Sequence, residues 1–334
     1  MDDRLQALRL WLEAIFDIPI DEMHSASADA SFRRYFRVHA GGATYIAMDA
    51  PPDKYDAHTY VRIARHFRSI GLNVPRVLHM EAQQGFLLLT DLGDELYLTQ
   101  LNHDTVDRLY GDAMRALRLL QRDDGMGAGL PDYDLRLLLE EVALFPEWYL
   151  GRHLGIRLTR QQQGVLERTF DALARCALDQ SRVCVHRDYH SRNLLVTDQQ
   201  NPGIVDFQDA VRGPVTYDLV SLLRDCYIAW PQARVEAWVR EYHGAALHAG
   251  IPVCEQPDRF LSWFDRMGVQ RHLKAVGIFA RLRHRDEKPG YLQDIPRTLG
   301  YVLEVSARHA DLQPLHDLLR DLRLTYMNTP SEAT

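Results

Sequence analysis

Apolar residues follow two different spacings along the chain, and the change comes close to residue 92. In the first ninety residues, most short apolar runs alternate with turn-forming residues, as in strands joined by tight turns. Two stretches instead repeat apolar residues every three or four positions, which is typical of one face of a helix. The pattern predicts helices over 3–16 and 57–69, two strands within 25–38, and further strands over 45–48, 77–80 and 86–89.

After residue 92 the helical spacing dominates. Thr159 and Gln162 form the sequence of a capping box, which predicts a helix from there to about residue 179. One stretch breaks the pattern, because apolar runs on both sides of Asn201-Pro202-Gly203 predict a β-hairpin. Further helices are predicted over 104–122, 134–150 with an interruption at Pro146, 217–229, 233–247, 258–282, 293–309 and 312–323.

These elements predict an α+β fold with two lobes. Residues 1–91 are expected to form a small antiparallel β-rich lobe, and residues 92–334 a larger and mainly helical lobe. A short hinge near residues 90–94 joins them.

Composition and charge narrow the class of protein. Of 334 residues, 46% are apolar and 25% charged, which is ordinary for a globular enzyme, and the net charge is -7. A negative chain does not suit nucleic acid or an anionic membrane, since both call for a basic face. The four cysteines form no C-x-x-C pair, and neither a signal peptide nor an apolar run of 18 residues is present. We therefore expect a cytoplasmic, monomeric protein with reduced thiols.

The strongest chemical signal lies between Val183 and Asp206. The order His-Arg-Asp188, four residues, then Asn193, followed by Asp206 at the end of a returning strand, is the pattern of the phosphotransfer loop of kinases. Asp188 is the candidate catalytic base. Asn193 and Asp206 are candidate ligands of Mg²⁺, which prefers a few protein oxygens and fills its shell with phosphate and water. The alternative is that these side chains only stabilise turns.

Candidate phosphate-binding residues lie in the first lobe. The small, polar stretch between the first two strands would let backbone N–H groups approach phosphates, although a plain hairpin loop has the same composition. The third strand, where kinases carry a phosphate-pairing Lys, reads Ile46-Ala-Met-Asp49 and has none. Arg33 and Arg34 are the nearest substitutes, unless they are ordinary exposed charges. The predicted phosphate-contacting residues of the loop are Ser27, Ala28, Asp29 and Ser31.

Two more groups of residues are candidates for binding. The hinge carries a set of residues whose backbone could pair with adenine, and the alternative is a buried strand end. A second set lies just after the hairpin and could bind a polyhydroxylated acceptor, with salt bridges and core packing as the alternative. Asp218 is expected to cap the next helix. The adenine set is Leu89, Thr90, Asp91 and Leu92, and the acceptor set is Asp209, Arg224, Asp225 and Tyr227.

The motif resembles that of a known family. Val185-His-Arg-Asp188 through Asn193, with Ile204-Val-Asp206-Phe and Asp218-Leu, is similar to the aminoglycoside/choline phosphotransferase family, which has a protein-kinase-like fold. The resemblance implies use of ATP and Mg²⁺, with Asp188 as the base and Asn193 and Asp206 as metal ligands.

Other segments are similar to one branch of that family, the bacterial anomeric kinases of amino sugars. They include Ser27-Ala-Asp-Ala-Ser-Phe-Arg-Arg and the Lys-less Met48-Asp-Ala-Pro-Pro. The branch implies phosphorylation of the C1 hydroxyl of N-acetylmuramate or N-acetylglucosamine during peptidoglycan recycling. Two alternatives stay open. The acceptor could be another alcohol, of aminoglycoside or choline type, or the protein could be an inactive nucleotide-binding regulator.

Overall fold

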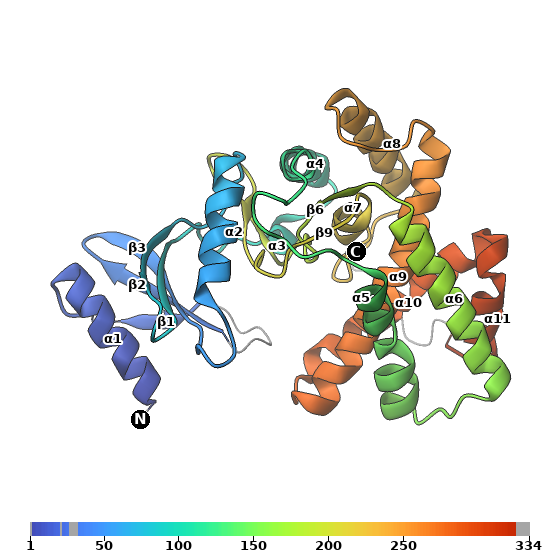
Figure 1. The fold of residues 1–334 in the computed structure, drawn as a ribbon, viewed down its shortest axis with the longest axis horizontal. Coiled ribbons are helices and arrows are strands. Elements are labelled where there is room, and N and C mark those ends of the chain that lie inside the picture. Colours follow the sequence, from blue (N-terminus) through green and yellow to red (C-terminus); the bar gives the residue numbers. More distant parts are fainter. Residues whose placement is uncertain (1, 21, 27–32, 325–334) are drawn as a thin grey trace. The chain divides into compact units, whose positions relative to one another are not determined.

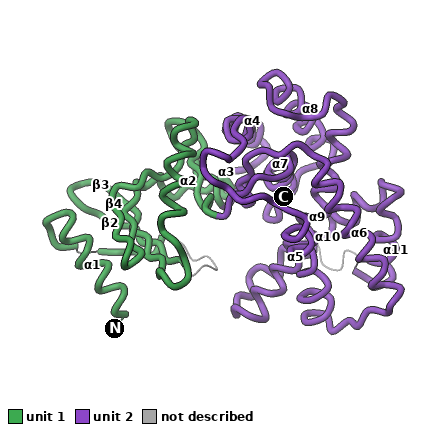
Figure 2. The backbone as a smooth tube through the Cα atoms, viewed as in Figure 1, with its two compact units in different colours: residues 1–100, 193–208 green, residues 101–192, 209–334 purple. Residues whose placement is uncertain are grey.

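The structure is a computed structural model that describes residues 2–20, 22–26 and 33–324. It divides into two compact units. Unit 1 comprises residues 1–100 and 193–208, and unit 2 comprises residues 101–192 and 209–334 (Figure 2). The predicted boundary between the two lobes, at residues 91 and 92, stays a prediction. Among the described residues, no helix is long and apolar enough to cross a membrane.

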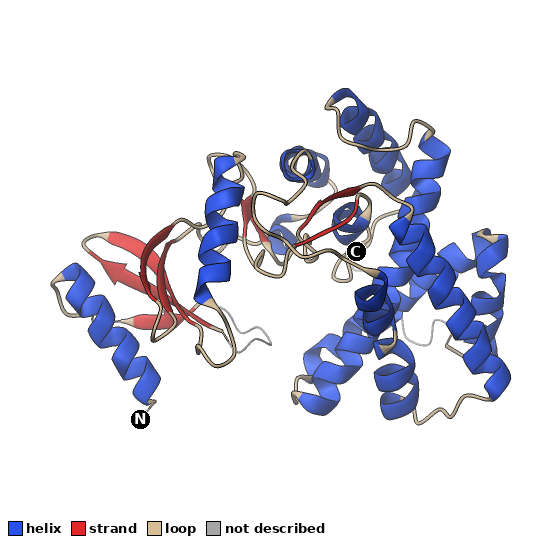
Figure 3. Ribbon diagram, in the orientation of Figure 1, coloured by secondary structure: helices blue, strands red, loops and turns tan. Residues whose placement is uncertain are grey.

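Unit 1 is built on an antiparallel sheet. In its described part, five strands lie in the order β1-β2-β3-β5-β4, which confirms the predicted β-rich lobe (Figures 1 and 3). The β2–β3 turn consists of Gly41 and Gly42, whose φ values of 57° and 77° suit a tight hairpin. The strands are β1 (Met23–Ser25), β2 (Arg34–Ala40), β3 (Ala43–Asp49), β4 (Val77–Glu81) and β5 (Phe86–Thr90).

Three helices and a second hairpin complete the described part of unit 1. Helix α1 (Asp3–Phe16) begins at the N-cap Asp2 and buries Leu8 and Leu12 in a cluster with apolar residues of the sheet. Helices α2 (Ala57–Ser69) and α3 (Tyr97–Gln100) follow, and α2 matches the predicted helix over 57–69. Strands β7 (Leu194–Leu195) and β8 (Gly203–Ile204) form the predicted hairpin. It is held in unit 1 because the N–H groups of Val196 and Ile204 donate to the carbonyls of Glu95 and Asn73, at 2.7 and 2.8 Å.

Unit 2 is mainly helical, and α9 (Pro257–Arg285) is its central helix, with 17 buried residues. A Cβ on Gly277 of α9 would lie 2.4 Å from the backbone carbon of Leu144, so the two backbones meet there in a way that only glycine allows. Strands β6 (Arg182–Val185) and β9 (Val211–Pro214) pair antiparallel. The other helices are α4 (Val106–Gln121), α5 (Leu135–Val142), η1 (Phe145–His153), α6 (Arg160–Leu178), α7 (Tyr217–Leu223), α8 (Gln232–His248), η2 (Pro289–Asp294), α10 (Ile295–Arg308), η3 (Ala310–Leu312) and α11 (Gln313–Asp321).

Most of the helix predictions in unit 2 are confirmed. The capping box of α6 is present with both of its reciprocal hydrogen bonds, and the stretch over 134–150 is interrupted next to Pro146. The predicted helix over 217–229 is too long, because α7 ends at Leu223. Beyond it the N–H of Tyr227 donates to the Asp225 carboxylate at 2.8 Å, and a side chain thus replaces the helical acceptor.

Candidate active site

The loop that carries Asp188 is anchored through its backbone by a buried acid. Asp218 is fully buried, and its two carboxylate oxygens accept hydrogen bonds from the N–H groups of His186 and Arg187, at 2.6 and 2.9 Å. These bonds stabilise Arg187 in the left-handed region, at φ 76°, a conformation that is costly for a residue with a side chain. The prediction that Asp218 caps the next helix is therefore wrong. The N-cap position of α7 belongs to Thr216, which makes no capping bond.

The Arg187 side chain is held in a buried polar network. Its guanidinium pairs with Glu141 of α5 and lies 5.8 Å from the ring centroid of Tyr133. Lys274 of α9 pairs with the same Glu141 at 2.9 Å and donates to the hydroxyl of Tyr217 at 3.0 Å. Burial opposes ionisation of Glu141, but the charges of Lys274 and Arg187 hold its pKa below the usual value. Two cations and one carboxylate leave this network with a net positive charge.

That charge acts on Asp188. Burial alone would raise the pKa of Asp188, but Lys274, Arg271 and Arg187 lower it to about 2. The carboxylate is thus ionised throughout the neutral range and can accept a hydrogen bond from an acceptor hydroxyl. Asp218 has the opposite balance, since burial raises its pKa to about 7 despite the two backbone donors.

A second acid holds the far end of the loop. One oxygen of Asp225 accepts from both the N–H and the hydroxyl of Ser191, at 2.9 and 2.5 Å, and the other accepts from the N–H of Tyr227. The loop over 186–191 is therefore fixed at both ends by carboxylates that follow β9 in sequence. Residues so constrained suit a site whose reactive group must not move.

In unit 1, Asn193 and Asp206 lie at the two ends of the β7–β8 hairpin. The N–H of Val205 donates to the carbonyl of Asn193 at 3.1 Å, so the two backbones are adjacent there. Asp206 has a left-handed backbone, at φ 63°. One of its oxygens accepts from Arg33 at 3.2 Å and from Gln208 at 2.9 Å.

The chemistry of these groups fits a hard cation. An amide oxygen and a carboxylate are the ligand types that Mg²⁺ takes from proteins. The described residues contain no cluster of three or more His, Cys, Asp or Glu side chains suited to a metal. A cation here would therefore depend on Asn193, Asp206 and oxygens from water and phosphate.

The structure distinguishes the two arginines predicted to replace the missing Lys. Arg34 pairs with the buried carboxylate of Asp49, its partner across β2 and β3, and also with Asp2. Arg4 of α1 binds the same Asp49, with Nε at 3.1 Å. Arg33 instead reaches Asp206 and stacks on the ring of Tyr55, 5.0 Å from its centroid. Of the two, only Arg33 contacts a residue of the predicted phosphotransfer motif.

The other predicted nucleotide contacts divide into two sets. Ser27, Ala28, Asp29 and Ser31 lie outside the described residues. In the second set, Leu89 is buried and Thr90 ends β5. Asp91, which precedes Leu92, accepts hydrogen bonds through its carboxylate from Nε of Arg37 at 2.6 Å and from the N–H of Gly93 at 2.9 Å. The turn after β5 is thus rigid, and its contact with adenine stays a prediction.

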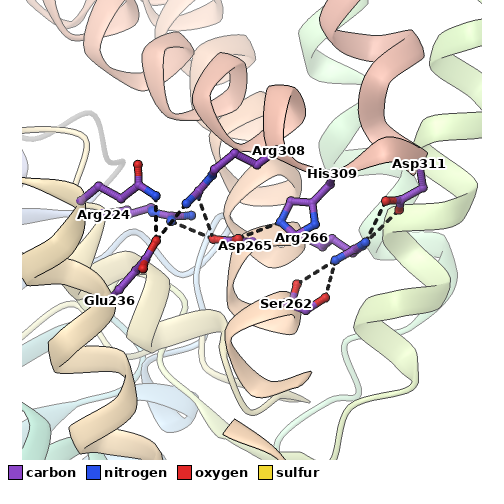
Figure 4. Close-up of polar contacts among 9 residues, drawn as sticks. Arg224, Glu236, Ser262, Asp265, Arg266, Arg308, His309 and Asp311 are labelled. Carbon is purple, nitrogen blue, oxygen red and sulfur yellow. Dashed lines mark hydrogen bonds and ion pairs between the residues drawn. The ribbon is translucent and has the colours of Figure 1, made fainter. Parts of the chain in front are cut away.

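The predicted acceptor-binding residues have different surroundings. Asp209 is exposed, and its carbonyl accepts from Arg187 at 3.3 Å. Arg224 is buried and forms a 2.8 Å ion pair with Asp265, which also binds Arg308 and His309 (Figure 4). This network accounts for Arg224 structurally.

Asp225 braces the loop, and the ring of Tyr227 lies 3.9 Å from the guanidinium carbon of Arg192. The roles of these four residues in acceptor binding remain predictions.

Sequence reasoning missed the residues that set the charge around Asp188. Glu141 on α5 and Arg271 and Lys274 on α9 are charged residues at buried positions. A charge in such a position is costly unless it is paired. Spacing alone did not separate these buried charges from the exposed charges on the same helices, such as Glu140, so the sequence offered no clear signal for them.

Comparison with known proteins supports the kinase interpretation of the motif. A model of the phosphotransferase enzyme family matches residues 22–256. The chain is 46% identical over 332 residues to an N-acetylmuramate/N-acetylglucosamine kinase of Pseudomonas putida, covering 96% of this chain and 97% of the relative. A protein of the same name from Neisseria meningitidis is 43% identical, over 94% of this chain and 95% of the relative.

Solved structures extend the comparison to the fold. The GDP complex of an aminoglycoside 2'-phosphotransferase aligns with a TM-score of 0.61 and 16% identity, over 92% of this chain and 99% of that one. Aminoglycoside phosphotransferase APH(4)-Ia aligns with a TM-score of 0.58 and 15% identity, over 93% of this chain and 99% of that one. These likenesses confirm the predicted protein-kinase-like fold.

Proposed function

Because the chain belongs to the phosphotransferase enzyme family, we propose that it is an ATP- and magnesium-dependent kinase. Its acceptor is the anomeric C1 hydroxyl of N-acetylmuramate and N-acetylglucosamine, the sugars in the names of its relatives. The observation that carries the proposal is the ionised Asp188 on a loop whose backbone is fixed by Asp218. The protein acts as a monomer in the cytoplasm, in peptidoglycan recycling.

Asp188 orients the acceptor. Phosphoryl transfer depends mainly on positioning and charge stabilisation, with little covalent work for the protein. A carboxylate with a pKa of about 2 is a weak base, so Asp188 first accepts a hydrogen bond from the C1 hydroxyl. It receives the proton late, when the hydroxyl oxygen is already bonding to phosphorus and has become acidic. Lys274 and Arg271 keep the carboxylate ionised until then.

Unit 1 handles the phosphates. Asn193 and Asp206 would hold Mg²⁺, which neutralises phosphate charge when bound. Arg33 takes over the phosphate-pairing function of the missing Lys, since Arg34 is committed to Asp49. A guanidinium binds phosphate oxygens in a bidentate way, which makes it a suitable replacement for an ammonium group.

The test is a substrate panel. The protein is incubated with ATP, Mg²⁺ and free N-acetyl sugars, their C1-blocked methyl glycosides, aminoglycosides and choline, and ADP release is followed. We expect turnover of the free sugars and none of the methyl glycosides. Turnover only of the amines would support an amino-alcohol acceptor, and ATP binding without turnover of any compound would support the regulator. Unchanged turnover in Asp188→Asn would exclude the mechanism.

A further inference from the structure

Arg192, which lies between Ser191 and Asn193, has an unusual setting in unit 2. Its guanidinium carbon is 3.9 Å from the ring centroid of Tyr227 and 5.4 Å from that of Tyr291. Tyr291 in turn stacks on Phe279 of α9, with centroids 5.7 Å apart and ring planes at 19°. We call Arg192, Tyr227 and Tyr291 the arginine clamp. The rings fix the plane of the guanidinium while leaving its N–H edge available.

No residue in the described part of the chain forms a hydrogen bond or ion pair with Arg192. The neighbouring acids are used elsewhere. One oxygen of Asp225 accepts from Ser191 and the other from the N–H of Tyr227, and Asp294 pairs with Arg297 at 2.9 Å. Arg192 is close enough to Asp294 to act against the rise that burial causes in its pKa. A guanidinium with five donors and no acid partner is an anion-binding group.

Two further polar atoms of this region lack hydrogen bonds from described residues. The side chain of Asp294 is 8% exposed, and its Oδ2 accepts none. His190 packs its ring against Tyr227, with centroids 5.3 Å apart, and its Nδ1 is buried without a partner. Buried polar atoms in folded proteins are normally paired. Two such atoms, close to an Arg192 guanidinium that has no acid partner, indicate a site for a polar ligand.

The arginine clamp lies close in sequence to Asp188, the proposed catalytic base. Arg192 follows Asp188 by four residues on the same loop, and the Asp225 bonds to Ser191 fix the intervening backbone. A ligand whose hydroxyl is held by Asp188 would thus present its other groups to residues of this loop.

The geometry points to Arg192 as the residue that binds a carboxylate of the acceptor and so favours N-acetylmuramate over N-acetylglucosamine. The two sugars differ by a lactyl ether, which gives the muramate one carboxylate, and a guanidinium edge binds a carboxylate with two parallel hydrogen bonds. Asp294 and His190 offer an acceptor and a ring nitrogen for neutral groups of the sugar. The inference rests on the proposed function, because it assumes that both sugars are acceptors.

A nucleotide phosphate has the same anionic chemistry, and the test must separate the two. We would measure kcat/KM for each sugar, and KM for ATP, in the wild type, Arg192→Gln and Arg192→Lys. We expect Arg192→Gln to lose roughly 10- to 100-fold in kcat/KM for N-acetylmuramate, the range for one hydrogen-bonded charge, with little change for N-acetylglucosamine. Arg192→Lys keeps the positive charge but not the two parallel N–H donors of the guanidinium. Its loss of kcat/KM for N-acetylmuramate should therefore be intermediate.

Arg152 on η1 provides a matched control, since its exposed guanidinium also lies over an aromatic ring, 4.3 Å from the centroid of Trp148. Arg152→Gln should leave both sugars unaffected. Equal losses for both sugars in Arg192→Gln, with a raised KM for ATP, would assign Arg192 to phosphate and overturn the inference. Unchanged kinetics in Arg192→Gln would show that the arginine clamp serves only packing, and this result would also overturn the inference. A wild-type protein that turns over neither sugar would instead refute the proposed function and the inference together.

Discussion

The loop over 186–192 and the ends of the β7–β8 hairpin carry consecutive parts of one motif, but they are held in different ways. The loop is bound through its backbone by Asp218, which is fully buried. Asp206 on the hairpin accepts hydrogen bonds from the side chains of Arg33 and Gln208, and its own side chain is 40% exposed. The buried contacts favour a fixed position. The exposed ones can be exchanged, which suits a residue that binds a cation and releases it in each cycle.

The largest effect should follow from removing the charge that the rigid loop positions. Asp188→Asn is expected to lower kcat roughly 10²- to 10⁴-fold, the usual contribution of a general base, without unfolding the protein. Steady-state ADP release and a thermal melt would measure both. Asp171→Asn, an exposed acid paired with Arg175 on α6, is the matched control. Comparable losses in both variants would show that the effect is not specific to the loop.

Asp218→Asn tests whether the rigidity depends on the buried acid. An amide can accept only one of the two backbone N–H groups, and its own NH₂ would face the other. We expect the free energy of unfolding to fall by about 2 kcal/mol, together with a loss of kcat. Urea denaturation would measure the first, and ADP release the second. Normal stability and activity would mean that the loop keeps its conformation without these bonds.

The difference in the free energy of unfolding between the wild type and Asp218→Asn should depend on pH, because the pKa of Asp218 is raised in the folded protein. In the folded protein this pKa is about 7, above the usual value of 3.8, so the folded state binds more protons between these limits. The stability that Asp218 contributes is fully present below its pKa in the unfolded chain, and it declines as the pH rises through about 7. Relative to Asp218→Asn, the wild type should therefore lose about 2 to 3 kcal/mol of stability between pH 5 and 8. Urea melts of both proteins across this range would measure it, and a difference that does not change with pH would contradict it.

The smallest effect is expected from a substitution at Arg33, which contacts the partly exposed Asp206. Arg33→Gln should raise KM for ATP by roughly tenfold, because one charged contact to phosphate is lost. Arg34→Gln is the natural comparison, since it removes a partner of the buried Asp49 and should lower stability more than nucleotide affinity. Initial rates at varied ATP and a denaturant melt distinguish the two variants. The opposite assignment, with Arg34 controlling KM, would refute the role given to Arg33.

The sequence was sufficient wherever the information is local. The capping box of α6 and the hairpin turn at Asn201-Pro202-Gly203 depend on neighbouring residues, and the structure confirms both elements. The role of Asp218 depends on the tertiary contact that brings α7 to the backbone of His186 and Arg187, which no spacing encodes. The choice between Arg33 and Arg34 depends on strand register, because only Arg34 lies opposite Asp49.

The charge at the end of β3 has a practical consequence for chemical labelling. A reactive nucleotide analogue designed to acylate a lysine beside the phosphates needs an amine on this strand, and β3 carries no lysine between Ala43 and Asp49. Its last residue is instead an acid bound by Arg4 and Arg34. Such reagents would find no amine on this strand, so an activity-based survey of a proteome could pass over this protein even while it is fully active.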